Sequence, residues 1–163
     1  YYQILVDCLV AEQITPLSQS RSRKKFVKSP KFLLYDLGVR RVAAGEGRDV
    51  PSRYLGELFE QWVGLELLRL MRLSPKKSSL HFWRNTSGVE VDWVLDIESR
   101  YIPVEVKWAE APNPRHTRHI HAFLDEYTNS SQGYIICRIP RPQKLSDRVL
   151  ALPWTMIDTI LPK

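Results

Sequence analysis

The sequence predicts a mixed α/β fold in which helices flank a central mixed β-sheet. A long apolar helix pattern occupies residues 53–73, and two alternating strands joined by a tight turn occupy residues 88–108. A continuous apolar run at 133–139 is typical of a buried strand. Because helix and strand patterns alternate along the chain, a sheet covered by helices is favoured over an all-helical or all-strand fold.

The elements around these three are shorter, and each is read from its own local pattern. Polar or Pro- and Gly-containing stretches separate them, and GEGRDVPS at 45–52 is the clearest break and a candidate boundary. The expected elements are a helix end at 1–11, an extended piece at 13–17, a basic loop or hairpin arm at 18–30, a strand at 31–36, a short helix at 38–44, a strand at 80–85, a helix at 114–128, a strand within 145–153 and a terminal helix at 154–161.

The helix at 53–73 is apolar around nearly its whole circumference, so we expect it to be buried on several sides. Glu57, Glu60 and Gly64 nevertheless share one stripe, and Gly64 would let another backbone approach closely. A glutamate on a buried helix is costly unless something satisfies it. A salt bridge and a functional role are both open interpretations of Glu60.

The hairpin at 88–108 places every charge on one face when its turn lies at Glu98-Ser99. In that register Asp92 lies opposite Glu105, and Glu90 lies opposite Lys107. The apolar face then comprises Val91, Trp93, Leu95, Ile97, Ile102, Val104, Val106 and Trp108, and the charged face Glu90, Asp92, Asp96, Glu105 and Lys107.

Two acids directly opposite each other destabilise a sheet, so the Asp92–Glu105 pair needs a reason. A bound divalent cation provides one. Carboxylates are the ligands that Mg²⁺ prefers, and a bound Mg²⁺ can polarise a phosphoryl oxygen and activate a water. A nearby lysine such as Lys107 can position that water and stabilise the charge that develops on phosphorus. With Glu60, the set suits metal-dependent phosphodiester hydrolysis.

The alternative is that these charges simply form the solvent face of a hairpin. A single Glu-x-Lys triplet is a weak signal. The combination of an opposed Asp–Glu pair, a following lysine, a glutamate on a buried helix and a basic chain makes a metal site equally credible.

Bulk properties set outer limits on function. The net charge of +6 and the pI of about 9.4 are compatible with nucleic-acid binding but do not require it. No apolar run has the length of a membrane span. Cys8 and Cys137 lie in apolar runs without metal-type spacing, so buried thiols in a reducing, cytoplasmic setting are expected. Because the chain begins with Tyr1, we expect it to be part of a longer protein.

The pattern of a helix acid, an Asp and then Glu-x-Lys on adjacent strands resembles the PD-(D/E)XK nuclease superfamily. Asp92, Glu105 and Lys107 match its sheet residues, and Glu60 matches its helix acid better than Glu57. Val91 stands where the superfamily has proline. The resemblance implies a restriction-endonuclease-like sheet and a nuclease that uses Mg²⁺ or Mn²⁺, with Asp92 and Glu105 as metal ligands.

A narrower resemblance covers nearly the whole chain. The runs KSPKFLLYDLGVRRVAAG, YLGELFEQWVGLELLRL, HFWRNTSGVEVDWVLDI and IPVEVKW are similar to the C-terminal domain of uncharacterised bacterial and archaeal AAA-type ATPases. It implies that residues 1–30 are the tail of a winged-helix segment, that 31–163 are a nuclease-like domain, and that a P-loop ATPase lies upstream in the same polypeptide. The sequence contains no G-x-x-x-x-G-K-[ST], so we expect no ATPase activity in this chain.

Two further residue classes complete the expectations. The histidines lack partners at zinc-type spacing, and parity assigns Trp93 and Trp108 to the core. The main hypothesis is a Mg²⁺-dependent DNA nuclease module, and the alternative is an inactive nuclease-fold module that binds DNA or protein and regulates the ATPase. Taken alone, the basic clusters favour an ordinary solvated surface; under the main hypothesis the expected phosphate contacts are Arg23, Lys24, Lys25, Lys28, Arg84, Arg115 and Arg118.

Overall fold

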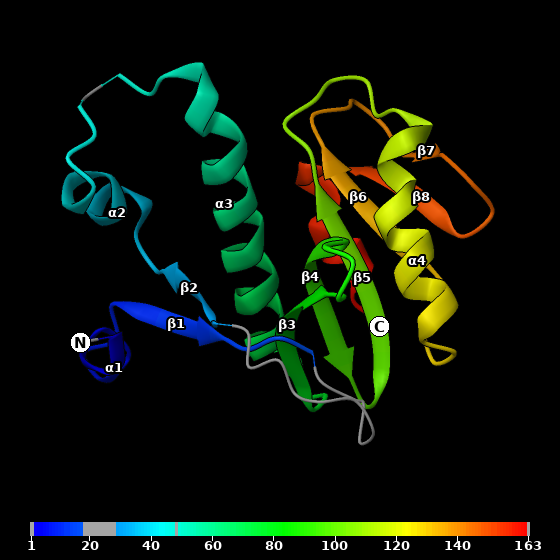
Figure 1. Cartoon of the computed structure of the whole chain (residues 1–163), viewed down its shortest axis with the longest axis horizontal. Helices are drawn as coiled ribbons and strands as arrows, with labels where there is room; N and C mark the ends of the chain where they lie inside the picture. Colours follow the sequence, from blue (N-terminus) through cyan, green and yellow to red (C-terminus); the bar gives the residue numbers. More distant parts are fainter. Residues whose placement is uncertain (1, 18–28, 48, 163) are drawn as a thin grey trace.

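The computed structural model describes residues 2–17, 29–47 and 49–162, and it confirms the predicted mixed α/β fold (Figure 1). The elements follow the expected order apart from an additional short strand at 143–144, and the last helix and the first turn of the helix after the hairpin are 3-10 helices, labelled η. They are α1 (Tyr2–Asp7), β1 (Ala11–Ile14), β2 (Lys31–Leu34), α2 (Leu37–Ala43), α3 (Ser52–Leu73), β3 (Ser78–Arg84), β4 (Glu90–Ile97), β5 (Arg100–Val106), η1 (Pro114–Thr117), α4 (Arg118–Glu126), β6 (Gly133–Cys137), β7 (Gln143–Lys144), β8 (Val149–Pro153) and η2 (Trp154–Ile160).

The main sheet has six strands in the order β3-β4-β5-β6-β8-β7. β3, β4 and β5 form an antiparallel meander, whereas β5, β6 and β8 run parallel to one another. The carboxyl ends of β5, β6 and β8 therefore share one edge of the sheet. Because β4 is antiparallel to β5, the amino end of β4 reaches that same edge.

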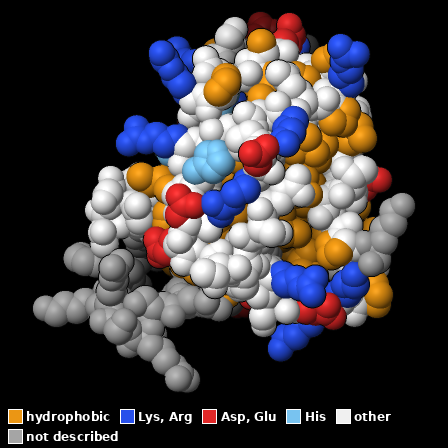
Figure 2. All heavy atoms as spheres, turned by 90° about the vertical axis from the view of Figure 1, so that its right-hand side faces the viewer, with side chains coloured by type: hydrophobic (Ala, Val, Ile, Leu, Met, Phe, Trp, Pro, Cys, Tyr) orange, Lys and Arg blue, Asp and Glu red, His pale blue; other side chains and the backbone are white. Residues whose placement is uncertain are grey.

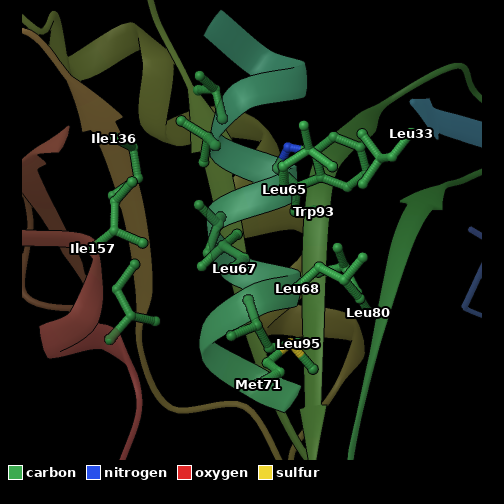
Figure 3. Packing of buried hydrophobic residues seen from close by; sticks show 14 of the residues in the cluster. Leu33, Leu65, Leu67, Leu68, Met71, Leu80, Trp93, Leu95, Ile136 and Ile157 are labelled. Carbon is green, nitrogen blue, oxygen red and sulfur yellow. The ribbon is translucent and has the colours of Figure 1, made fainter. Parts of the chain in front are cut away.

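Helices cover both faces of this sheet, as Figure 1 shows. α3 and η2 pack on one face around Leu67, Leu95 and Ile136, part of the cluster seen in Figure 3. α4 packs on the other face through Ile120 and Phe123. Burial of these apolar surfaces on both sides of the sheet is the main stabilising contribution, at roughly 25 cal/mol per Å² of apolar area.

Close packing of α3 on the sheet depends on Gly64, although not in the way that was predicted. A Cβ at Gly64 would lie 2.7 Å from Trp93 Cζ2, so an indole ring and not a second backbone fills the space. Trp93 Nε1 also donates to the Glu60 carbonyl oxygen at 3.1 Å. Trp93 is 1% exposed, which confirms its predicted place in the core. This contact fixes the distance between the helix that carries Glu60 and the strand that carries Asp92.

The N-terminal elements form a small unit beside the sheet. β1 and β2 pair antiparallel, and the chain after β1 reaches β3, where Leu17 N donates to the Phe82 carbonyl oxygen at 2.8 Å. The winged-helix assignment of residues 1–30 stays a prediction, and much of its basic stretch lies outside the described residues. Cys137 is buried as expected, but Cys8 is exposed because α1 ends at Asp7 and presents it to solvent.

Candidate metal and phosphodiester site

A β-bulge in β4 determines the position of Asp92. His81 pairs with Val94 and Trp83 pairs with Val91, so the single residue Phe82 stands opposite both Asp92 and Trp93. Such an insertion bends the strand and redirects side chains. The predicted alternation is therefore wrong at this point: Val91 packs with Val94 on the α4 side of the sheet, whereas Trp93 packs on the α3 side.

The predicted register of the hairpin is confirmed from Trp93–Val104 to Ile97–Arg100, but the ladder ends before Asp92. Asp92 and Glu105 are consequently not paired across a regular ladder. Asp92 Oδ2 instead accepts a hydrogen bond from the Val106 backbone N–H at 2.8 Å. The carboxylate thus bridges β4 and β5 where the two strands separate, at the shared edge of the sheet.

The environment of the Asp92 carboxyl disfavours its ionised form. Burial raises the pKa of Asp92 to about 8, and the negative charges of Glu105 and Glu60 act in the same direction. The Lys107 ammonium and the Val106 N–H oppose this shift only in part. A carboxyl with so high a pKa is a candidate metal ligand, because a bound cation would stabilise its ionised form.

Glu105 is the second buried acid of the site. It is 3% exposed, and its Oε1 accepts from Lys107 Nζ at 2.8 Å and lies 3.6 Å from His119 Nδ1. Among the described residues, Glu105 Oε2 has no hydrogen-bond partner. An unsatisfied buried carboxylate oxygen is costly, and a metal ion would satisfy it.

The ammonium group of Lys107 interacts with the charges of both acids. Burial alone would lower the pKa of its ammonium, but the charges of Glu105 and Asp92 outweigh burial and raise it. Lys107 is therefore a protonated cation at neutral pH. It can attract a phosphate and stabilise negative charge that develops on it.

Glu60 approaches this site from α3. Its negative charge raises the pKa of Asp92, whereas Glu57 is an exposed residue whose partner is Arg40 at 3.6 Å. Geometry thus favours Glu60 over Glu57 as the helix acid. The predicted alternative of a salt bridge is also present, because Lys31 Nζ lies 3.0 Å from Glu60 Oε1.

The Glu90–Lys107 pairing expected from the hairpin register is wrong. Glu90 Oε2 accepts from Arg84 Nε at 2.6 Å, and Glu90 Oε1 lies 3.0 Å from Lys31 Nζ. Burial alone would raise the pKa of Glu90, but its bonds to Lys31 and Arg84 lower it. The bulge turns Glu90 away from the site and toward these cations.

The donor set fits a hard divalent cation with an incomplete protein shell. Within residues 2–17, 29–47 and 49–162, no three Asp, Glu, His or Cys side chains converge as a preformed metal cage. Mg²⁺ differs from zinc in this respect, because it commonly takes one or two carboxylates and keeps waters and substrate phosphate as its other ligands. Asp92 and Glu105 supply such a pair, and the unsatisfied Glu105 Oε2 is the observation that supports the fit.

The raised pKa of Asp92 predicts how the metal-free protein responds to pH. Folded protein keeps a proton that the unfolded chain, with a pKa near 3.8, releases. The contribution of the Asp92 carboxyl to the free energy of unfolding is fully present below about pH 4 and is lost as the pH rises toward about 8. Thermal melting in chelator across this range should therefore show a falling melting temperature, and the fall should be smaller in Asp92→Asn. Equal pH slopes for the two proteins would contradict this assignment.

The predicted phosphate contacts are only partly brought together. Arg115 and Arg118 are exposed on η1 and at the start of α4, the helix whose His119 reaches Glu105. Arg84 is engaged by Glu90. Figure 2 shows basic side chains dispersed among acidic and hydrophobic ones on the face it displays. Arg23, Lys24, Lys25 and Lys28 lie outside the described residues.

Sequence reasoning missed the roles of Lys31 and His119 and misplaced Trp108. Lys31 begins β2 without any local sign of a distant acidic partner, and nothing in the histidine cluster at 116–121 indicates that His119 approaches Glu105. Trp108 is 41% exposed, so its predicted burial is wrong. β5 ends at Val106, and the strand parity used for Trp108 does not extend past that end.

Comparisons with known proteins give one family and one structure. The family model described as "Domain of unknown function (DUF4143)" matches residues 55–157. A solved structure, titled a refined half-complex from a tetradecameric assembly of Thermococcus gammatolerans McrB AAA+ hexamers with bound McrC, is similar at 14% identity and a TM-score of 0.42. The similarity covers 61% of this chain and 27% of that one. No curated protein matches.

Proposed function

The chain belongs to the DUF4143 family, and we propose that its function is that of a Mg²⁺- or Mn²⁺-dependent nuclease module that hydrolyses DNA phosphodiester bonds. The proposal depends chiefly on one observation. At the open end of the β4–β5 hairpin, the charge of Glu105 acts on Asp92, Glu105 is buried and Asp92 half-buried, and Lys107 Nζ contacts Glu105.

Each residue has a distinct part in this chemistry. Asp92 and Glu105 would hold the cation, which polarises the phosphoryl oxygen and activates a water when bound. Lys107 would orient that water and stabilise the charge that develops on phosphorus. The negative charge of Glu60 would help to hold the cation. Arg84, Arg115, Arg118 and the basic residues between 21 and 28 would contact phosphates.

The proposal includes a setting for this module. The sequence resemblance to C-terminal domains of AAA-type ATPases supports an upstream ATPase in the same cytoplasmic polypeptide as its partner. In the part of the chain that the structure describes, no helix has both the length and the apolar character to cross a membrane.

A direct assay tests the proposed activity. Purified protein is incubated with supercoiled plasmid and linear DNA in Mg²⁺, Mn²⁺ or chelator. Cleavage in the presence of either metal and none in chelator is the expected result. Intact DNA under every metal condition, with protein shown to be folded, would refute nuclease activity.

A second candidate function is favoured by Lys31. Its ammonium contacts Glu60 and Glu90 at 3.0 Å each and lies over the rings of Trp93 and Phe82. A cation of the chain itself thus partly neutralises the acids next to the site. This arrangement suits a module that binds or regulates and does not cut. Lys31→Met should increase Mn²⁺ affinity if the lysine competes with the metal, whereas no change would remove the support for this candidate.

A further inference from the structure

A row of aromatic side chains lies beside the proposed catalytic site and has no role in it. We call it the aromatic platform, and it consists of Phe59, Trp62, Trp108 and Trp154. Phe59 stacks on Trp62 with ring centroids 6.1 Å apart and contacts Trp108 edge to face at 5.1 Å. Trp62 contacts Trp154 edge to face at 5.4 Å. The four rings therefore form one continuous chain of contacts.

The topology of the sheet places this platform at the same edge as the acids. Trp108 follows the carboxyl end of β5, and Trp154 follows the carboxyl end of β8. Trp108 is the residue after Lys107, and Phe59 is the residue before Glu60. The rings pack on the α3 side of this edge around Phe59, whereas Glu105 contacts His119 of α4 on the other side, so a polymer that reaches both crosses the end of the sheet.

The platform combines a buried ring with rings that are accessible to solvent. Phe59 is buried, whereas Trp108 and Trp154 are 41% and 44% exposed. Large aromatic rings exposed to this extent next to a concave surface are typical of a binding site. Beside Trp62 and Trp154 lies a hollow of about 260 Å³.

The polar side chains around the platform suit bases, which carry hydrogen-bonding groups, better than a purely apolar partner. The Arg138 guanidinium lies 4.2 Å from the centre of the Trp108 ring and also binds Glu110 at 2.7 Å. Arg138 follows the end of β6, the strand that lies between β5 and β8 in the sheet. Glu66 and Asp158 line the hollow, where they can accept hydrogen bonds from amino groups of bases but would repel phosphates.

We infer that the aromatic platform stacks unpaired bases of a DNA strand whose backbone enters the proposed catalytic site. Bases inside a duplex present no free faces to such rings, whereas every unpaired base does. The inference rests on the proposed nuclease function and specifies its substrate as single-stranded or locally melted DNA.

The test measures binding without cleavage. Anisotropy of a fluorescent oligothymidylate of about 12 nucleotides, and of a blunt duplex of the same length, is recorded in chelator. Tighter binding of the single strand is expected. Trp108→Ala and Trp154→Ala should each weaken it about 10-fold, a loss typical of one stacked base. Trp108→Phe should retain most of the affinity.

The control is Tyr2→Ala, which removes an exposed aromatic ring from α1, away from the platform. Circular dichroism melting establishes that each variant is folded. Equal affinity for single strand and duplex would overturn the inference, as would wild-type binding by both tryptophan variants. Trp108-dependent binding without any metal-dependent cleavage would support the platform and refute only the nuclease activity.

Discussion

Asp92→Asn should reduce metal-dependent DNA cleavage by at least about 100-fold, the loss expected when one charged group of an electrostatic site is removed. Asparagine has nearly the same shape, and its carbonyl oxygen can still accept from the Val106 N–H, so the open end of the hairpin should keep its geometry. What disappears is the negative charge that holds the cation. Cleavage of plasmid DNA in Mg²⁺ measures the loss.

The same variant should be more stable than the wild type in chelator at neutral pH. Ionisation of Asp92 in the folded state is opposed by burial and by two neighbouring acids, and the amide has no such penalty. A gain in stability together with a loss of activity is the signature of a strained functional site. A residue that merely supports the fold would lose both.

Asp96→Asn is the matched control. Asp96 lies on the same strand, and its Oδ1 accepts from the Ser99 N–H at 3.0 Å, a bond that asparagine can also make. It should cleave DNA like the wild type. Wild-type cleavage by Asp92→Asn, or an equal loss in both variants, would contradict the role assigned to Asp92.

Much of the fold could be predicted because it follows from local patterns. Three local patterns each identified one element: the apolar pattern of α3, the turn at Glu98-Ser99 and the apolar run of β6. The register of β4 with β5 followed from the turn. Tertiary packing then agreed with local preference in each case, which is the condition under which sequence reasoning succeeds.

The structure brings Asp92, Glu105 and Lys107 together at the open end of the hairpin, but not in the predicted geometry. The bulge at Asp92–Trp93 depends on pairing with β3, and no local pattern in β4 predicts it. Without the bulge, Asp92 would face Glu105 across a ladder and Glu90 would face Lys107. Lys31 was missed for a related reason, since its contact with Glu60 joins elements that are far apart in sequence.

Lys107→Met should separate cation binding from catalysis. Methionine has a similar length but no charge, so the site loses the positive charge that Lys107 supplies beyond the end of β5, and cleavage should fall about 100- to 1000-fold. Mn²⁺ binding should be retained or strengthened, because the ammonium that repels a cation is gone while Asp92 and Glu105 remain. Titration calorimetry with Mn²⁺ and the plasmid assay measure the two effects independently.

Two comparisons make the result specific to position 107. Lys144→Met removes a lysine of the same kind from β7, where it pairs with Asp147, and it should cleave normally. Lys107→Arg keeps the positive charge beside Glu105 and should recover part of the activity. If Lys107→Met lost Mn²⁺ binding together with cleavage, the lysine would hold the acids in place and not act on the phosphate. Retained Mn²⁺ binding with lost cleavage would instead assign its charge to the reaction itself, because the ion would be bound while the phosphate lacked its second cation.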